Sequence, residues 1–152
     1  MGRLARRHST ATVLFHHAVA ERLGLGPTDH KVLDLLRERG TMTGSEIAAV
    51  TGLTTGAITG VVARLERAGF LRREPDLRDG RKQNLTVSTD RAQHVHGLLA
   101  PMRNEVASLL VRFDLRQLDA IAEFLKGSAE LAYRQVAVLR AESLGGGERA
   151  GE

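Results

Sequence analysis

Apolar residues recur at steps of three and four along most of the chain, a spacing that predicts helices joined by short turns. In the first such pattern, Ser9 or Thr10 is placed to cap the helix start. Thr28 offers a side-chain oxygen at the start of the second pattern, and Gly40 follows its end as a predicted left-handed cap. The helical patterns cover residues 9–25, 28–39, 43–51, 54–68, 89–113 and 114–144.

The third and fourth patterns are joined by a short turn that contains glycine. Thr43-Gly-Ser-Glu46 matches a capping box, in which each side chain bonds the backbone of the other residue. Gly52 ends this short helix, and Thr54 is placed to cap the next one, which Gly69 ends. Two helices around such a turn are typical of a helix-turn-helix.

A β-hairpin is predicted next, because "FLRRE" and "QNLTVS" alternate apolar and polar residues around a turn that contains Pro75 and Asp79-Gly80. In the two long patterns that follow, Pro101 is expected to bend the first helix and Gly127 to kink the second. Residues 145–152 are glycine-rich and predict an unstructured tail.

The chain has 152 residues, of which 42% are apolar, so it is long enough for one domain with a core. It contains no cysteine, which excludes disulfides, thiolate metal sites and cysteine nucleophiles and fits a cytoplasmic protein. No stretch has the length of a membrane span, and no signal peptide is recognisable. We therefore expect a cytoplasmic protein with no membrane partner.

The net charge of +4 is concentrated in two places. Residues 1–8 carry three arginines, and residues 54–89 carry seven cations against four acids. The second segment contains the helix-turn-helix and the hairpin, so its charge predicts an anionic partner, double-stranded DNA.

Two parts of this segment have the chemistry of DNA contact. The helix from residue 54 begins with small or hydroxylic side chains that let the backbone approach base edges, namely Thr54, Thr55, Gly56, Ala57 and Thr59. Arg64 lies one turn further on and is expected to contact a phosphate. In the hairpin, Arg78 and Arg81 are the expected minor-groove probes. The remaining hairpin cations are expected on backbone phosphates, and these are Arg72, Arg73 and Lys82.

The segment from residue 40 to 88 closely resembles the MarR family of winged helix-turn-helix regulators, most specifically in "RLERAGFLRRE" and "DLRDGR". The family organisation covers residues 9–144. The resemblance implies a mainly α fold with a small β-hairpin wing, formed by a winged helix-turn-helix and by N- and C-terminal dimerisation helices. The corresponding segments are 1–27 for the N-terminal arm and dimerisation helix, 28–88 for the DNA-binding lobe, 89–144 for the long dimerisation helices and 145–152 for the tail.

The resemblance also implies a homodimeric repressor on a near-palindromic DNA site. It implies that Asp79 orients Arg81, and that a small aromatic or anionic effector binds near His16, His17, Arg22 or His30. Family members often carry a basic residue where this chain has Gly60, so the set of base-reading residues stays open.

Other functions are less consistent with the sequence. The six histidines form no HxxxH pair, and we predict no metal and no cofactor. The chain has no GxSxG, P-loop, dinucleotide or HExxH motif, and we predict that it is not an enzyme. One alternative remains open, a winged-helix protein-interaction module that uses the wing arginines to grip an acidic partner.

Overall fold

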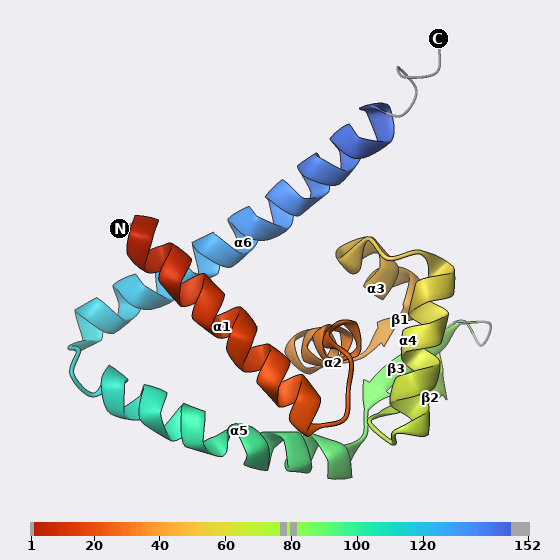
Figure 1. Ribbon diagram of the computed structural model, residues 1–152, viewed down its shortest axis with the longest axis horizontal. Coiled ribbons are helices and arrows are strands. Elements are labelled where there is room, and N and C mark those ends of the chain that lie inside the picture. The colour runs from red at the N-terminus through yellow and green to blue at the C-terminus, as the bar shows by residue number, and fades with distance from the viewer. Residues whose placement is uncertain (1, 77–78, 80–81, 147–152) are drawn as a thin grey trace. The chain divides into compact units, whose positions relative to one another are not determined.

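The computed structural model describes residues 2–76, 79 and 82–146, and only the backbone of residues 142–146. Its described part is mainly helical with a small antiparallel sheet, which confirms the predicted fold class. The elements are α1 (Gly2–Arg22), α2 (Pro27–Arg39), β1 (Met42–Thr43), α3 (Gly44–Thr51), α4 (Thr55–Arg67), β2 (Leu71–Pro75), β3 (Gln83–Val87), α5 (Thr89–Leu110) and α6 (Leu115–Gly146) (Figure 1).

The chain divides into two compact units, residues 1–99 and 100–152. In the first unit, β2 and β3 form the predicted hairpin, with Leu71 opposite Val87 and Pro75 opposite Gln83. The two-residue strand β1, which was not predicted, pairs Met42 with Leu85 on the other side of β3. The resulting sheet has the order β1-β3-β2.

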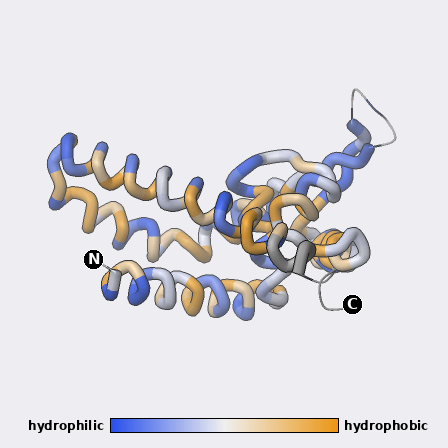
Figure 2. The backbone as a smooth tube through the Cα atoms, turned by 90° about the horizontal axis from the view of Figure 1, so that it is seen from above, coloured by the Kyte–Doolittle hydropathy of each residue, from blue (hydrophilic) through white to orange (hydrophobic). Residues whose placement is uncertain are grey.

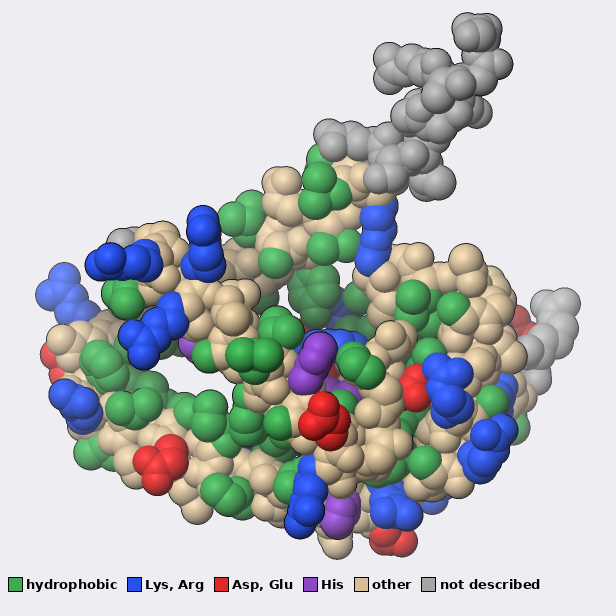
Figure 3. Space-filling model, viewed as in Figure 1, with side chains coloured by type: hydrophobic (Ala, Val, Ile, Leu, Met, Phe, Trp, Pro, Cys, Tyr) green, Lys and Arg blue, Asp and Glu red, His purple; other side chains and the backbone are tan. Residues whose placement is uncertain are grey.

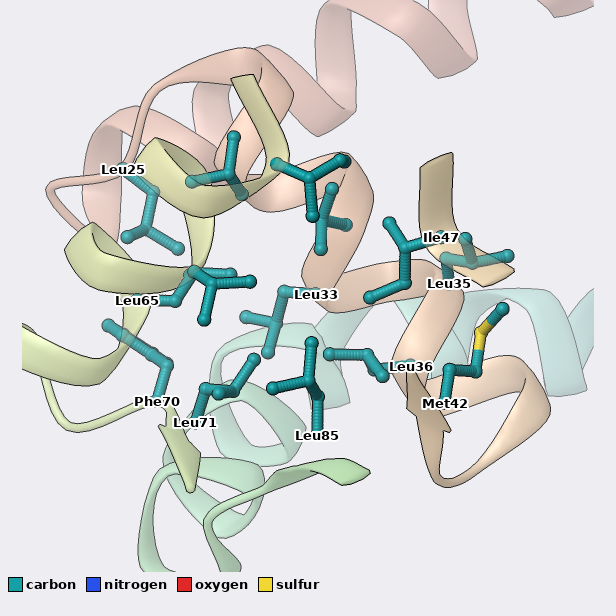
Figure 4. Close-up of a cluster of buried hydrophobic side chains, with 14 of the residues drawn as sticks. Leu25, Leu33, Leu35, Leu36, Met42, Ile47, Leu65, Phe70, Leu71 and Leu85 are labelled. Atoms are coloured by element: carbon teal, nitrogen blue, oxygen red, sulfur yellow. The ribbon is translucent and has the colours of Figure 1, made fainter. Parts of the chain in front are cut away.

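One apolar core holds the first unit together, with residues from α2, α3, α4 and all three strands (Figure 4). Leu33, Ile47 and Leu65 are completely buried, so each of these helices turns one face inward. Val95 of α5 is also completely buried in this core. The division between the two compact units therefore falls inside α5.

Several helix ends differ from the sequence predictions. Helix α1 begins at Gly2, so Ser9 and Thr10 lie inside it and are not caps. Its first turns are rich in Arg, Ala and Leu, which favour helix even without an apolar stripe. The N-cap of α2 is Gly26 without a side-chain bond, and Thr28 lies inside the first turn after Pro27, a residue favoured at the first helical position.

The two long helices are continuous. Helix α5 runs through Pro101, and α6 runs through Gly127 as far as Gly146. Residues 147–152, the last part of the predicted tail, lie outside the described residues. Gly40 has a positive φ of 79° but not the left-handed conformation that was predicted, since its ψ is −137°.

The second unit, formed by the rest of α5 and by α6, buries none of its described side chains. Apolar positions recur along these helices (Figure 2). Leu109 is 54% exposed, Phe124 63% and Leu139 61%. Among the described residues, no single helix has the length and apolar character of a membrane span. Helices α3 and α4 reach that length and apolar character only together, and they are bent by 116° at the break between them.

Candidate nucleic-acid interface

Helices α3 and α4 form the predicted helix-turn-helix, with an angle of 116° at the turn between them. The Thr43 hydroxyl accepts a hydrogen bond from the Glu46 amide at 3.3 Å, and the Glu46 carboxylate accepts one from the Thr43 amide at 2.7 Å. The bond from the Thr43 amide lowers the pKa of Glu46 most, and a bond that the Thr43 hydroxyl donates to the same carboxylate oxygen at 2.9 Å lowers it further. Gly52 in the turn adopts the left-handed conformation with φ 68°. The predicted capping box and glycine turn are thus confirmed.

Helix α4 has one buried and one exposed face. Ile58, Val61, Val62 and Leu65 are buried against α2, α3 and β2. All five small or hydroxylic residues predicted to face DNA are exposed, namely Thr54, Thr55, Gly56, Ala57 and Thr59. A Cβ placed on Gly56 would have no neighbour within 4 Å, so packing within the protein does not require a glycine there.

Two of the threonine hydroxyls on this face are already used within the helix. The Thr54 hydroxyl accepts from the Ala57 amide at 3.2 Å and caps α4 as predicted. The Thr59 hydroxyl donates to the Thr55 carbonyl at 2.9 Å. The Thr55 hydroxyl has no partner within the described part of the chain. It is therefore the threonine on this face whose hydrogen-bonding capacity is wholly available to a ligand.

Arg64 lies further along α4 and makes an ion pair that the sequence did not predict. Its Nε and Nη2 donate to the two carboxylate oxygens of Asp29 at 2.9 and 2.7 Å. The Asp29 side chain is 7% exposed, and its hydrogen bonds and charge raise the pKa of Arg64. A Cβ on Gly60 would lie 3.3 Å from Nη1 of Arg64, so the absence of a side chain at Gly60 leaves room for this pair. Arg64 thus joins α4 to α2.

The wing turn is organised by Asp76, which was given no role from the sequence. Its Oδ1 accepts from the Asp79 amide and its Oδ2 from the Asn84 side-chain amide, both at 2.9 Å. The Asp76 amide donates to the Lys82 carbonyl at 3.0 Å, and the Lys82 amide donates to the Asp79 carbonyl at 2.8 Å. An aspartate that opens a turn and bonds an amide three residues later is a recognisable sequence signal for this role.

The cations of the wing fall into three groups. Arg73 pairs with Glu66 of α4, with Nε 2.9 Å from both carboxylate oxygens, and so connects β2 to α4. Arg72 and Lys82 are exposed. The two predicted minor-groove probes, Arg78 and Arg81, lie outside the described residues.

The residues predicted to contact an effector do not gather at one place. His16 of α1 and His30 of α2 lie with ring centroids 5.4 Å apart, and both are close to Asp34 of α2. His17 and Arg22 are exposed on α1. Burial lowers the pKa of both His16 and His30 and outweighs the opposite effect of Asp34. The sequence prediction missed Asp34, although its position four residues after His30 places both on one face of a helix.

Comparison with known proteins decides the family. Residues 25–82 match the MarR family model. The HTH-type transcriptional regulator YcgE of Bacillus subtilis is 37% identical over 137 residues, which cover 90% of this chain and 89% of YcgE. The chain belongs to the MarR family. It is a DNA-binding transcriptional regulator.

Solved structures of MarR-family regulators share the fold. A mutant of MepR from S. aureus aligns with a TM-score of 0.72 at 17% identity, over 85% of this chain and 94% of MepR. A second MepR mutant, bound to an oligodeoxyribonucleotide, aligns with a TM-score of 0.58 at 18% identity, over 85% of this chain and 95% of that one. BpsR of Bordetella bronchiseptica, whose DNA binding is regulated by 6-hydroxynicotinic acid, aligns with a TM-score of 0.54 at 22% identity, over 85% and 92%. At these identities the likeness supports the fold alone.

Proposed function

We propose that this MarR-family protein is a homodimeric repressor that acts in the cytoplasm, without enzymatic activity, on a near-palindromic DNA site. The observation that carries the proposal is the exposed face of α4, where small and hydroxylic residues surround Gly56 while the opposite face is buried. Such a helix can enter a major groove closely enough for Thr55 to reach a base edge.

The wing supplies the second contact in this proposal. Arg78 and Arg81 enter the neighbouring minor groove, where an extended guanidinium fits the focused negative potential. Asp79 orients Arg81, while Arg72 and Lys82 contact phosphates. Asp76 supports this role, because its carboxylate bonds both the Asp79 amide and the Asn84 side chain in the protein without DNA.

The exposed apolar side chains of α5 and α6 support the homodimer. Apolar surface left in water costs about 25 cal/mol per Å² relative to burial, and a twofold interface would cover it on both chains. Two copies of α4 would then address half-sites about one helical turn apart. The twofold relation between the two copies is the reason for proposing a near-palindromic site.

We also propose that a small aromatic or phenolic anion releases the repressor. A pocket of about 370 Å³ lies between α2 and the turn from α3 to α4, lined by Pro27, Thr28, Lys31, Val32, Thr51 and Leu53. Its lining is mostly apolar, with Thr28, Lys31 and Thr51 as the residues that have polar side chains, which suits an aromatic carboxylate if the flexible Lys31 turns toward the pocket. Because Thr51 and Leu53 adjoin the helix-turn-helix, occupancy of the pocket would favour one arrangement of α3 and α4. BpsR, regulated by 6-hydroxynicotinic acid, supports the effector class.

The decisive experiment selects bound sequences from random duplex DNA with the full-length protein. It then compares the selected site with unrelated duplex and with an unrelated acidic protein over several salt concentrations. We expect one dimer per site, by sedimentation, and a footprint with twofold symmetry. Equal affinity for all duplexes and stronger retention by the acidic protein would favour the protein-interaction module instead.

The effector is tested separately on the selected site. A panel of aromatic carboxylates and phenols, beginning with 6-hydroxynicotinic acid, should contain compounds that weaken DNA binding. Lys31→Met should reduce that response. Its DNA affinity, measured in the absence of any compound, should equal that of the wild type. If no compound in the panel changes DNA binding, the protein is better described as a repressor that acts without an effector.

A further inference from the structure

Three side chains converge where α1 packs on α2. His16 comes from α1, whereas His30 and Asp34 lie one turn apart on α2. Asp34 Oδ2 is 3.3 Å from Nδ1 of His16 and 3.4 Å from Nδ1 of His30. One ligand atom from each of the three residues lies within 4.8 Å of the other two. Figure 3 shows histidine side chains next to acidic and basic ones near the centre of the visible face.

The two distances from Asp34 to the histidines match the spacing of ligands around a small metal ion, and the two histidines are near enough to share it. A tetrahedral zinc ion with bonds of about 2.0–2.1 Å holds its ligand atoms about 3.3–3.5 Å apart. Two imidazoles and one carboxylate are a common ligand set for zinc and related divalent ions, with water in the fourth position. We propose that His16, His30 and Asp34 bind one divalent transition-metal ion, with zinc as the best fit. This proposal differs from the sequence prediction of no metal site, and the experiment below decides between the two.

An unsatisfied nitrogen atom also supports this proposal. Nδ1 of His16 is buried and has no hydrogen-bond partner within the described part of the chain, although it lies 3.3 Å from Asp34 Oδ2. His30, whose Nδ1 faces the same carboxylate oxygen, is 2% exposed. A buried polar atom without a partner costs free energy, and an ion bound by Nδ1 of His16 would satisfy it. Since burial lowers the pKa of both rings, the neutral form that a metal requires is favoured.

Two cations compete for the same carboxylate. Lys31 Nζ lies 3.7 Å from Asp34 Oδ2, and Arg37 Nη1 lies 3.6 Å from Asp34 Oδ1. Lys31 is 61% exposed and has a flexible side chain, so it can leave Oδ2 when an ion binds. An anion is a poor fit at this place because the Asp34 carboxylate lies next to both rings. The cations should therefore weaken metal binding without preventing it.

The test measures metal binding directly and uses no DNA, so its outcome does not depend on the proposed function. Metal-free full-length protein is titrated with Zn²⁺ in competition with a chromophoric chelator of micromolar affinity. We expect the protein to withdraw one zinc ion per chain. Co²⁺ should give the visible absorption of a four-coordinate ion.

Four variants separate this site from adventitious binding. His16→Ala and Asp34→Asn should each weaken zinc affinity by at least about 10- to 100-fold, the loss that follows removal of a partner one shell further from the ion. His17→Ala is the matched control, because it changes a neighbouring exposed histidine, and it should leave the affinity unchanged. Lys31→Ala should tighten binding, because it removes the competing ammonium. Circular dichroism checks the fold of each variant, and His16→Ala decides the matter if Asp34→Asn does not fold.

Two results would overturn the proposal. The first is a wild-type protein that withdraws no zinc from the chelator. The second is a loss of affinity in His17→Ala as large as that in His16→Ala, which would assign the ion to surface histidines.

Discussion

Replacing Gly56 with alanine should stabilise the protein and weaken its DNA binding at the same time. Glycine is less favourable than alanine by about 0.8–1.0 kcal/mol in a helix interior. Gly56 is the second residue of α4, where less of this difference is realised, and an added Cβ meets nothing within 4 Å. We therefore expect a gain of about 0.3–0.8 kcal/mol, equivalent to about 1–3 °C in Tm.

The effect on DNA has the opposite sign if the backbone of Gly56 approaches the bases. A methyl group forced into a close-packed contact costs about 1–3 kcal/mol, or roughly 5- to 150-fold in affinity per half-site. Gly97→Ala is the matched control, since Gly97 lies exposed inside α5 and also has open space around its Cα. It should raise Tm without changing DNA affinity. The assays are thermal unfolding and fluorescence anisotropy with the selected duplex.

One result would refute this reasoning. If Gly56→Ala binds the selected duplex as tightly as Gly97→Ala does, α4 does not approach DNA at Gly56. The residues that contact the bases would then lie elsewhere in the helix-turn-helix.

The wing and the capping box give further predictions. Arg81→Ala should cost about 1–3 kcal/mol of DNA binding per subunit and lower the salt slope by about one unit. Asp79→Ala makes the wing more positive, yet it should weaken specific binding and leave binding to random duplex equal or stronger; tighter specific binding would reject the orienting role of Asp79. The pKa of Glu46 is lowered from 4.5 by its bonds to Thr43, so its contribution to stability is present above that pH and is lost as the pH falls through the folded-state pKa. The stability difference between wild type and Glu46→Gln, measured by urea unfolding, should thus shrink from about pH 6 to about pH 3, and a constant difference would argue against the capping bond as its cause.

Features that depend on neighbouring residues could be predicted from the sequence. The capping box at Thr43 and Glu46 and the cap at Thr54 follow from side chains three residues from their partners. The left-handed Gly52 follows from the same local logic, because a residue without Cβ adopts that conformation at little cost. These caps determine where α3 ends and α4 begins, and hence which face of α4 is exposed.

Features that depend on distant residues could not be predicted. Strand β1 exists only because Met42 pairs with Leu85. The ion pair of Arg64 with Asp29 joins residues that are 35 positions apart, and nothing near Arg64 in the sequence indicates it. Likewise, His16 meets Asp34 only because α1 packs on α2. The sequence therefore indicated helix α4 but not the ion pair by which Arg64 joins it to α2.

Adjacent residues of α2 contact both α4 and α1. Asp29 bonds Arg64 of α4, and the His30 ring lies 5.4 Å from the His16 ring of α1. Asp29 and His30 are both almost completely buried, so a shift of the first turns of α2 would move both contacts. An ion between α1 and α2 and a DNA duplex on α4 would thus act on the same helix.

This arrangement predicts thermodynamic coupling, and the prediction rests on both the metal site and the DNA interface. Zinc should change the Kd for the selected duplex by at least about 5-fold, and the duplex must then change the Kd for zinc by the same factor. Asp29→Asn removes the charge that holds Arg64 but leaves His16, His30 and Asp34 in place. In this variant zinc should still bind, and the two Kd values should become independent of each other. The four Kd values of each protein are measured by chelator competition and anisotropy. If Asp29→Asn shows the same coupling as the wild type, the ion acts on DNA binding by a route other than the contact between Asp29 and Arg64. If the wild type shows no coupling, the two sites are independent.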